Sequence, residues 1–267
     1  MEDKLVMFGL IALVILSIVN AKNPIKNSRI FPNEQYSQTN TSGTSNSTQE
    51  SPEVLAEKVL EKDPVTSKLS LYLRIYGGYG SSANEEYITI ENTSKDKYID
   101  ITDFKLKSTS TNIEVTIPKT VKLYFTGMQN VEENVILGPQ EKAYVITGKS
   151  PTSNGMKLNK CSGYLTQYNN FSPSFSTNCP APRNEDLSSI PKTVNNDICF
   201  DLIDYYPSCR VQSEPISNMY SSECQNFIYK KINYPNCINT HKNDSDFWEK
   251  TWYVYLKRSE KVWKDRR

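Results

Sequence analysis

Six cysteines are the residues whose type and spacing point most directly to chemistry in this 267-residue sequence. They all lie in one stretch of the chain: Cys161, Cys179, Cys199, Cys209, Cys224 and Cys237. Zinc-binding cysteines usually come in pairs separated by about two to four residues, and no pair here is that close. An even number of cysteines behind an export signal is typical of disulfides. We therefore expect three disulfides; the alternative is a set of free buried thiols in a cytosolic protein.

The pairing of these cysteines depends on two helices, which apolar side chains at helical spacing predict over residues 196–206 and 222–232. A straight helix separates cysteines at its two ends by about 15 Å, more than the roughly 7 Å that a disulfide spans. An antiparallel hairpin of the two helices instead predicts the pairs Cys199–Cys237, Cys209–Cys224 and, by default, Cys161–Cys179. The sequential alternative is Cys199–Cys209 with Cys224–Cys237, through chain reversals at Pro207 and Pro235.

His241 is the single histidine, which excludes sites that need two histidines on one chain, such as most zinc hydrolases and two-histidine iron centres. A Ser-His-Asp site would have to use it, but no nucleophile motif is present and its polar surroundings predict a turn. The sequence also lacks a phosphate-binding loop and the glycine-rich dinucleotide fingerprint.

Carboxylates offer no better catalytic arrangement. Asp244 and Asp246 lack the spacing and the terminal Glu of a calcium-binding EF-hand loop. The pairs Glu85–Glu86 and Glu132–Glu133 are adjacent in sequence, so in a strand their side chains point to opposite faces and form no acid/base couple. We therefore expect no catalytic residue, no metal and no cofactor, and interpret the chain as a protein that is not an enzyme.

The charge balance bears on nucleic-acid binding. The sequence has 31 Lys and Arg against 30 Asp and Glu, a formal net charge of +1. A polybasic nucleic-acid binder depends on excess cations facing phosphates, so this class is not favoured. The basic end from Lys257 to Arg267 is interpreted as a solvated helix face, with an anionic contact site as the alternative.

The N-terminal residues 1–22 are predicted to be a signal peptide or a membrane anchor. The apolar run from Leu5 to Val19 spans about 22 Å as a helix, short of the roughly 30 Å hydrocarbon core of a bilayer. That length suits a signal peptide, and Val19-Asn20-Ala21 offers small residues for cleavage. If the segment stays uncleaved, residues 5–21 contact the membrane. Residues 23–66, rich in Ser, Thr and Asn, are predicted to be a flexible tether with a short helix after Ser51.

Short alternating segments follow from residue 67 to residue 148. Leu69, Leu71, Leu73 and Ile75 fall on one face of a strand, and further strands are predicted near residues 87–90, 99–106, 113–117, 121–125, 131–137 and 143–146. Turn residues separate them. This spacing predicts a mainly β fold, an antiparallel β-sandwich of immunoglobulin-like size.

Three of these segments, in order, resemble the lamin tail domain family. They are Glu86-Tyr87-Ile88-Thr89-Ile90-Glu91-Asn92, then Asp100-Ile101-Thr102-Asp103-Phe104-Lys105-Leu106, then Leu137-Gly138-Pro139-Gln140-Glu141. Asp103-Phe104 stands where the family has Gly-Trp, and Gln140 stands where it has Gly. The resemblance implies an immunoglobulin-like fold over residues 67–148 and a role in binding or scaffolding.

The disulfide-linked, partly helical extension over residues 149–267 is similar to one in exported lamin-tail-domain proteins of candidate phyla radiation bacteria. The residues that carry this similarity include the stretches Asn159–Leu165, Phe171–Pro180 and His241–Leu256. The resemblance implies a further strand after the last helix, which either lies beyond Arg267 or is replaced by a different closure of the sheet.

Aromatic residues recur at helical spacing in the last segment, residues 246–267, which is predicted to be an amphipathic helix capped by Asp246 and Glu249. They are Trp248, Trp252, Tyr255 and Trp263. We expect these side chains to pack in the core. The alternative is an exposed aromatic stripe, with these four residues as candidate ligand contacts.

Together these patterns predict a non-catalytic module, secreted or anchored to the outside of the cell membrane, that binds an extracellular protein or polysaccharide or acts as a scaffold. The alternatives are an accessory part of an extracellular hydrolase and an extracellular nucleic-acid-binding module; the charge balance disfavours the second.

Overall fold

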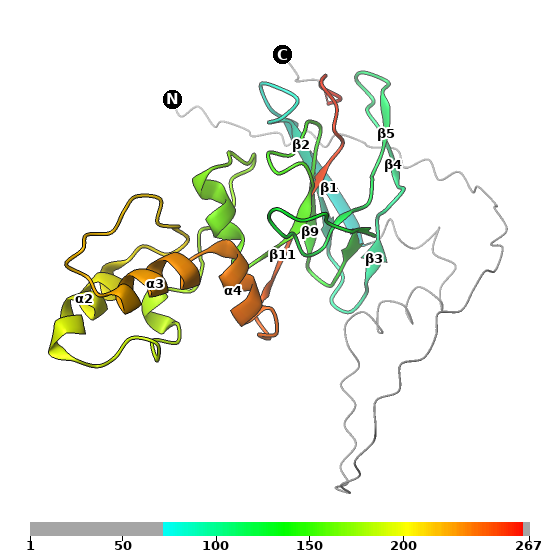
Figure 1. The fold of residues 1–267 in the computed structure, drawn as a ribbon. Helices are drawn as coiled ribbons and strands as arrows, with labels where there is room; N and C mark the ends of the chain where they lie inside the picture. Colours follow the sequence, from blue (N-terminus) through cyan, green and yellow to red (C-terminus); the bar gives the residue numbers. More distant parts are fainter. Residues whose placement is uncertain (1–71, 264–267) are drawn as a thin grey trace, which may run out of the picture.

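The computed structural model describes residues 72–263 (Figure 1). The expected signal peptide or anchor (1–22), the tether (23–66) and the first residues of the expected sandwich lie outside the described residues, as do residues 264–267. Among residues 72–263, no helix combines the length and the apolar character needed to cross a membrane.

Seven strands form one mixed sheet in the order β1-β2-β9-β11-β10-β6-β7. Their bounds are β1 Leu73–Tyr79, β2 Tyr87–Asn92, β6 Thr120–Val121, β7 Glu132–Glu133, β9 Lys142–Ile146, β10 Met156–Asn159 and β11 Trp248–Tyr255. β9 runs parallel to β11, and β10 runs parallel to β6. The prediction of a purely antiparallel arrangement is therefore wrong. Parallel neighbours need a long crossover, and the chain between β9 and β11, which includes the extension, provides it.

Two short ribbons share a core with one face of this sheet. β3 (Ile99–Asp100) pairs with β8 (Ile136–Leu137), and β4 (Lys105–Lys107) pairs with β5 (Glu114–Thr116). The buried cluster that joins ribbons and sheet includes Ile88, Ile90, Ile99, Leu106, Val115, Leu137, Val145, Trp252 and Val254. This core confirms the predicted mainly β class.

β11 corrects the prediction for residues 246–267. The segment is not an amphipathic helix, because Trp248–Tyr255 form a strand in the middle of the sheet. Trp252 and Val254 belong to the core beneath the ribbons, whereas Tyr253 and Tyr255 belong to the core on the opposite face. Aromatic and β-branched residues favour strands. A strand buried on both faces also lacks the apolar/polar alternation that distinguishes a strand from a helix in sequence.

The extension covers the second face of the sheet. It contains the 3-10 helices η2 (Ser162–Gln167), η3 (Pro182–Asn184) and η4 (Val194–Asn196), and the α-helices α2 (Asp197–Tyr205), α3 (Ser222–Lys231) and α4 (Tyr234–His241). Figure 1 shows α4 next to the strands and α2 and α3 farther from them. The extension also supplies β10 and β11, so the sheet continues past residue 148, where we expected the sandwich to end.

The predicted helices 196–206 and 222–232 are present as α2 and α3, whereas α4 was missed. Asn233 caps α4 by accepting the backbone N–H of Asn236 at 2.9 Å, and Pro235 lies in the first turn. A capping Asn followed by a first-turn Pro is a sequence signal for the start of a helix. His241 therefore ends a helix, and the turn predicted for it is wrong.

The extension contains the three predicted disulfides, but every predicted pair is wrong. The bridges are Cys161–Cys237, Cys179–Cys209 and Cys199–Cys224, with Cα–Cα distances of 5.8, 5.2 and 5.8 Å. Cys199 and Cys224 both lie in the first turn of their helices, so the starts of α2 and α3 meet, in contrast to the assumed hairpin. Cys237 lies on α4, a helix that the sequence did not predict and that changes the position of this cysteine. The sequential alternative is also absent.

Another strand, β11, follows α4, the last helix of the described residues, and enters the sheet between β9 and β10. The further strand that the family resemblance implies stays a prediction.

Candidate functional site

The four aromatic candidates for ligand contact do not form an exposed stripe. Trp252, Tyr255 and Trp263 are 2%, 3% and 7% exposed. Trp248 is half-buried, with its ring 4.9 Å from that of Phe247. The prediction that these side chains pack in the core is confirmed, and the alternative of an aromatic binding face is wrong. Tyr255 is among the residues that line a pocket.

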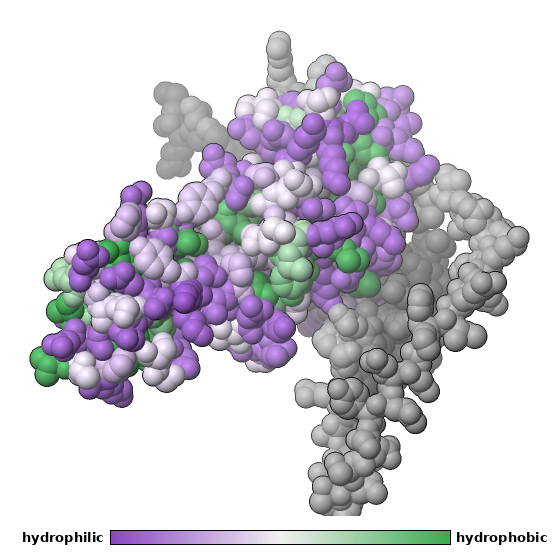
Figure 2. Space-filling view, in the orientation of Figure 1, coloured by the Kyte–Doolittle hydropathy of each residue, from purple (hydrophilic) through white to green (hydrophobic). Residues whose placement is uncertain are grey.

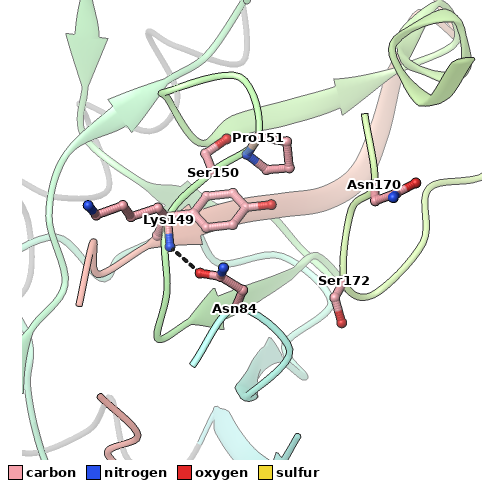
Figure 3. A pocket seen from close by; sticks show the side chains of 7 residues that line it. Asn84, Lys149, Ser150, Pro151, Asn170 and Ser172 are labelled. Atoms are coloured by element: carbon pink, nitrogen blue, oxygen red, sulfur yellow. Dashed lines mark hydrogen bonds between the residues drawn. The ribbon is translucent and has the colours of Figure 1, made fainter. Parts of the chain in front are cut away.

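This pocket lies at one end of the sheet, where the register of three strands brings their ends together. Tyr255 ends β11 and pairs with Ile146, which ends the parallel strand β9. Ile146 also pairs with Tyr87, which begins β2. The pocket has a volume of about 240 Å³ (Figure 3). Its lining consists of Asn84, Lys149, Ser150, Pro151, Asn170, Ser172 and Tyr255.

The pocket walls come from three connecting segments that the sheet holds in place. Asn84 Oδ1 accepts the backbone N–H of Lys149 at 2.9 Å, the contact drawn in Figure 3. Ser150 Oγ donates to the carbonyl of Asn154 at 2.6 Å, which fixes the turn after β9. The third wall is the segment from Asn170 to Ser172. It is anchored at the following residue, Pro173, whose carbonyl accepts a hydrogen bond of 3.0 Å from the hydroxyl of Tyr253.

Gly148 explains how Asn84 comes so close to the turn after β9. A Cβ on Gly148 would collide with both the side chain and the backbone of Asn84. Only a residue without a side chain therefore lets the two segments approach each other at this wall. Neither position stands out in the sequence, because the contact joins segments that are far apart along the chain.

Tyr255 contributes the buried part of the pocket. Its hydroxyl is buried and makes no hydrogen bond of normal geometry with the described residues. Burial raises the pKa of Tyr255, and the hydroxyl of Ser150 lowers this pKa by a smaller amount. The phenol is therefore neutral at physiological pH and can donate or accept a hydrogen bond.

The lining of the pocket is almost free of charge. Lys149 is its one charged residue, and Figure 3 shows the side chain of Lys149 pointing away from Asn170 and Ser172. The other side chains offer amide groups, hydroxyls and apolar carbon. The arrangement can form neutral hydrogen bonds but provides no nucleophile beside a general base.

His241, the sequence candidate for acid–base chemistry, lies in a cluster of charges. Its Nε2 is 3.0 Å from Glu185 Oε1, and its Nδ1 is 2.8 Å from Asp244 Oδ2. Burial by itself lowers the pKa of His241, but the hydrogen bonds with Glu185 and Asp244 outweigh this effect and raise the pKa. Because both ring nitrogens face carboxylates, neither is directed at a hydroxyl or thiol that it could activate.

Lys160 completes this cluster. Its ammonium group contacts Asp244 at 3.0 Å and also Asp246, so a lysine occupies the cation position between the two carboxylates considered for calcium. Within residues 72–263, no group of three or more His, Cys, Asp or Glu side chains is arranged to hold a metal ion.

As far as residue 263, the basic C-terminal segment is not the helix that the sequence predicts, and residues 264–267 lie outside the described part of the chain. Residues 256–263 include no helix. The backbone N–H groups of Lys257 and Arg258 donate to the carbonyls of Gly148 and Thr147, both at 2.9 Å. The segment therefore packs along the same end of the sheet as the pocket.

The surface visible in Figure 2 shows apolar residues in separate small patches, with several at the end of the extension farthest from the sheet. Val194 and Tyr205, at the two ends of the η4–α2 segment, are 85% and 89% exposed. Large apolar patches mark interfaces, but scattered apolar residues are usual on protein surfaces.

Comparisons with known proteins give no further guidance, because no family model, curated protein or solved structure matches this chain.

Proposed function

We propose that this chain is an exported, non-catalytic module of the lamin-tail type that binds or scaffolds at the cell surface. It is either secreted or held in the membrane through residues 5–21. Its sheet and ribbons would then correspond to an immunoglobulin-like sandwich, extended by the disulfide-linked segment.

The backbone at two family glycine positions is the observation that carries this proposal. Asp103 and Gln140 stand where the lamin tail pattern has glycine, and both have positive φ angles, 62° and 60°. This left-handed region favours glycine and is uncommon for other residues. The backbone at both positions therefore has a geometry that glycine would suit, which supports the resemblance to the family.

A buried asparagine links two of the three motif segments. Asn92, at the end of β2, is fully buried, and its Nδ2 donates to the carbonyls of Leu137 and Gly138 at 3.0 and 2.9 Å. The first and third motifs therefore meet in space through hydrogen bonds of the Asn92 side chain, and the backbone N–H of Asn92 also donates to the carbonyl of Glu141 at 2.9 Å. Such a link supports the interpretation of the ordered motifs as parts of one fold.

Support for export comes from the cysteines. All six are paired and belong to the buried cluster that joins the extension to the sheet. Disulfides of this kind persist in oxidising environments outside the cytosol. Support for binding without turnover comes from the near-neutral pocket and from His241, whose two nitrogens both face carboxylates.

Surface display of the full chain tests this proposal. We expect protease added to intact cells to remove the extension, and the purified chain to adhere to envelope polysaccharide or to an envelope protein. We also expect no thiol labelling of the denatured chain unless it is reduced. Six labelled thiols without reduction would contradict export, and hydrolysis of a glycan, ester or nucleic acid by the pure chain would contradict the non-catalytic role.

A further inference from the structure

The outer side of η4 and α2 carries a stripe of apolar side chains. Its members follow one another at intervals of four, four and three residues: Val194, Ile198, Leu202 and Tyr205. This spacing places side chains on one side of a helix. Three of the four are exposed and Leu202 is half-buried. Apolar residues scattered singly are usual on a surface, but a row along one helix is an apolar side that has no packing partner within the described chain.

A row of carboxylates borders this stripe. Asp197, Asp201 and Asp204 are all exposed, and their intervals of four and three residues place them on the adjoining side of α2. No ion pair or side-chain hydrogen bond joins any of the three to another residue in the described part of the chain. Arg183 comes near, but it donates to the backbone carbonyl of Asp204, at 3.2 Å, and not to a carboxylate.

These charges work against the stability of the free chain. Like charges four residues apart on a helix repel each other, and a carboxylate in the last turn opposes the helix dipole. Asp197 and Asp201 are four residues apart, and Asp204 lies in the last turn of α2, which contains no basic residue. Cationic side chains of a partner would relieve both effects. The charges therefore indicate a partner that brings Lys or Arg to this side of α2.

The other α-helices among the described residues lack this combination. α3 exposes Glu223 as well as Lys230 and Lys231, so both signs of charge are present. α4 exposes neutral residues such as Asn239 and Thr240. An apolar stripe beside charges of a single sign is therefore a property of α2.

α2 is held firmly in its place. The disulfide of Cys199 joins its first turn to that of α3, and Ile203 is buried in the core. Just before the helix, Asn196 Nδ2 donates to the carbonyl of Pro191 at 2.8 Å. A surface that is formed before its partner arrives reduces the ordering cost of binding. Figure 1 shows α2 at the end of the extension far from the strands, so a partner can reach it without contacting the sheet.

The stripe and the carboxylates together define the chemistry of the partner. A helix with apolar side chains along one side and Lys or Arg beside them meets both, and the docking of amphipathic helices on apolar surfaces is a recurrent mode of recognition. From Val194 to Tyr205 the stripe is roughly 17 Å long, about three turns of such a helix. A membrane surface is disfavoured, because its anionic headgroups would face the three carboxylates.

We propose that the stripe on η4 and α2, with Asp197, Asp201 and Asp204 beside it, docks a basic amphipathic helix of an extracellular protein. The inference rests on the proposed function, which it deepens by naming the docking surface and the class of partner.

Binding of a defined peptide tests the inference. The full chain, with its disulfides intact, is placed in nanodiscs of zwitterionic lipid, and empty nanodiscs serve as the reference. The probe is a fluorescent peptide of about 14 residues, or four helical turns, made of Leu along one side and Lys on the rest. A second peptide, with Glu in place of each Lys, is the charge control.

We expect the Lys peptide to bind with a Kd on the order of 10–100 µM, and the Glu peptide to bind at least about tenfold more weakly. A rise in salt from about 0.05 M to about 0.5 M should weaken binding of the Lys peptide several-fold, because salt screens ion pairs between exposed groups.

Variants at the surface and matched controls locate the binding. Tyr205→Ser and Asp201→Lys each change an exposed side chain, and each is expected to weaken binding of the Lys peptide about tenfold or more. Val131→Ser and Glu133→Lys make comparable changes at exposed residues beside and within β7, at one edge of the sheet. These controls should leave peptide binding unchanged.

Asp204→Asn separates a docking role from a structural one. It removes a charge from the last turn of α2, so it should raise the melting temperature by about 1–3 °C while it weakens peptide binding several-fold. A lower melting temperature would show that the carboxylate serves the fold, and would contradict its assignment to a partner.

Three results would overturn the docking surface: no binding of the Lys peptide, equal binding of the Lys and Glu peptides, or binding that Tyr205→Ser and Asp201→Lys leave unchanged. If these variants adhere to the envelope as well as the parent chain does, the surface role stands and α2 is not its site. If the chain is never displayed on cells, the proposed function fails, whereas the peptide titration still decides whether α2 binds a basic helix.

Discussion

Glu86 binds the backbone of Trp263 across 177 positions of sequence, through an N–H···Oε1 hydrogen bond of 3.0 Å. The other carboxylate oxygen accepts the N–H of Val262 and the hydroxyl of Thr147, both at 2.8 Å. Glu86 is fully buried. A carboxylate in a dry interior is costly unless strong donors surround it, and these three donors meet that need. The contact also holds the ring of Trp263 in the core beneath the ribbons.

Replacement of Glu86 by Gln is expected to destabilise the fold by about 2 kcal/mol or more, because the new NH₂ group faces donors and hydrogen bonds to a charged group are lost. Urea unfolding with the disulfides intact measures this. Glu85→Gln is the matched control, since Glu85 is exposed and its hydrogen bonds are with Ser81 and Ser82 in its own turn. Equal stability of the two variants would contradict the role assigned to Glu86.

Trp252→Ala is expected to destabilise the fold by about 3–5 kcal/mol, because it leaves a cavity in the core at the middle of the sheet. The loss of the bond from Trp252 Nε1 to Glu141 Oε2, at 3.3 Å, adds to this. Tyr168→Ala, at an aromatic residue that is 65% exposed, should change the unfolding free energy little. A small effect at Trp252 would contradict the central place of β11.

Asp103→Gly is expected to leave stability unchanged or to raise it by up to about 1 kcal/mol, since glycine adopts the left-handed backbone of this position without strain. Asp103→Val should destabilise, because a β-branched residue is least suited to positive φ. Thermal unfolding of the two variants measures the difference. If Val were tolerated as well as Gly, the positive φ angle and the family argument built on it would both be wrong.

Peptide mapping without reduction is expected to find Cys161 joined to Cys237, Cys179 to Cys209 and Cys199 to Cys224. Gly163→Ala should disturb the second bridge selectively, because a Cβ at this position would collide with the sulfur atoms of Cys179 and Cys209. Gly127→Ala is the control for backbone strain alone, because Gly127 has a positive φ angle of 72° but a Cβ there would meet open space and no sulfur atom. A peptide that joins Cys199 to Cys209 in the unreduced chain would contradict the observed pairing.

The charge cluster around His241 predicts a pH dependence of stability. The pKa of His241 is raised, so its stabilising effect is fully present below its ordinary pKa near 6.5 and is lost as the pH rises through the raised value. The bonds to His241 and Lys160 lower the pKa of Asp244, so the contribution of Asp244 is present above its ordinary pKa of 3.8 and is lost as the pH falls through the lowered value. The cluster, which also includes Glu185, therefore stabilises most between these limits.

Melting temperatures of the chain and of His241→Gln from about pH 4 to about pH 9 check this pH dependence. The difference between the two proteins should be largest below about pH 6.5 and should shrink at higher pH. A difference that is independent of pH would show that His241 is not protonated between the two carboxylates.

The parts of the fold that sequence predicted well are those set by nearby residues. The apolar spacing that predicts α2 and α3 lies within each helix. The apolar residues that predict β2 and β9 likewise lie within a few positions of one another. The number of disulfides follows from an even cysteine count. Each of these signals is local, so it survives without knowledge of the packing.

The parts that sequence missed depend on partners far along the chain. The spacing of Trp248 and Trp252 fits a helix as well as a strand. The segment forms the strand β11 because it pairs with β9 and β10, which the sequence pattern does not show. The disulfide pairs depend on where α4 places Cys237. The pocket depends on the strand register that places Tyr255 beside Ile146. It also depends on Gly148, which allows the close approach of Asn84. Neither relationship can be recognised in the sequence before the sheet is known.

The central place of β11 also has a consequence for the order of events during biosynthesis. β9 pairs with β11 in a register that sets Trp252 beside Ala143, about 110 positions earlier in the sequence. At a synthesis rate of about 5–20 residues per second, β9 waits about 5–20 s for its neighbour. During that time one edge of β9 has no neighbouring strand. A chain exported as proposed above must pass unfolded through a narrow secretion channel, and the late synthesis of β11 would delay completion of this part of the sheet.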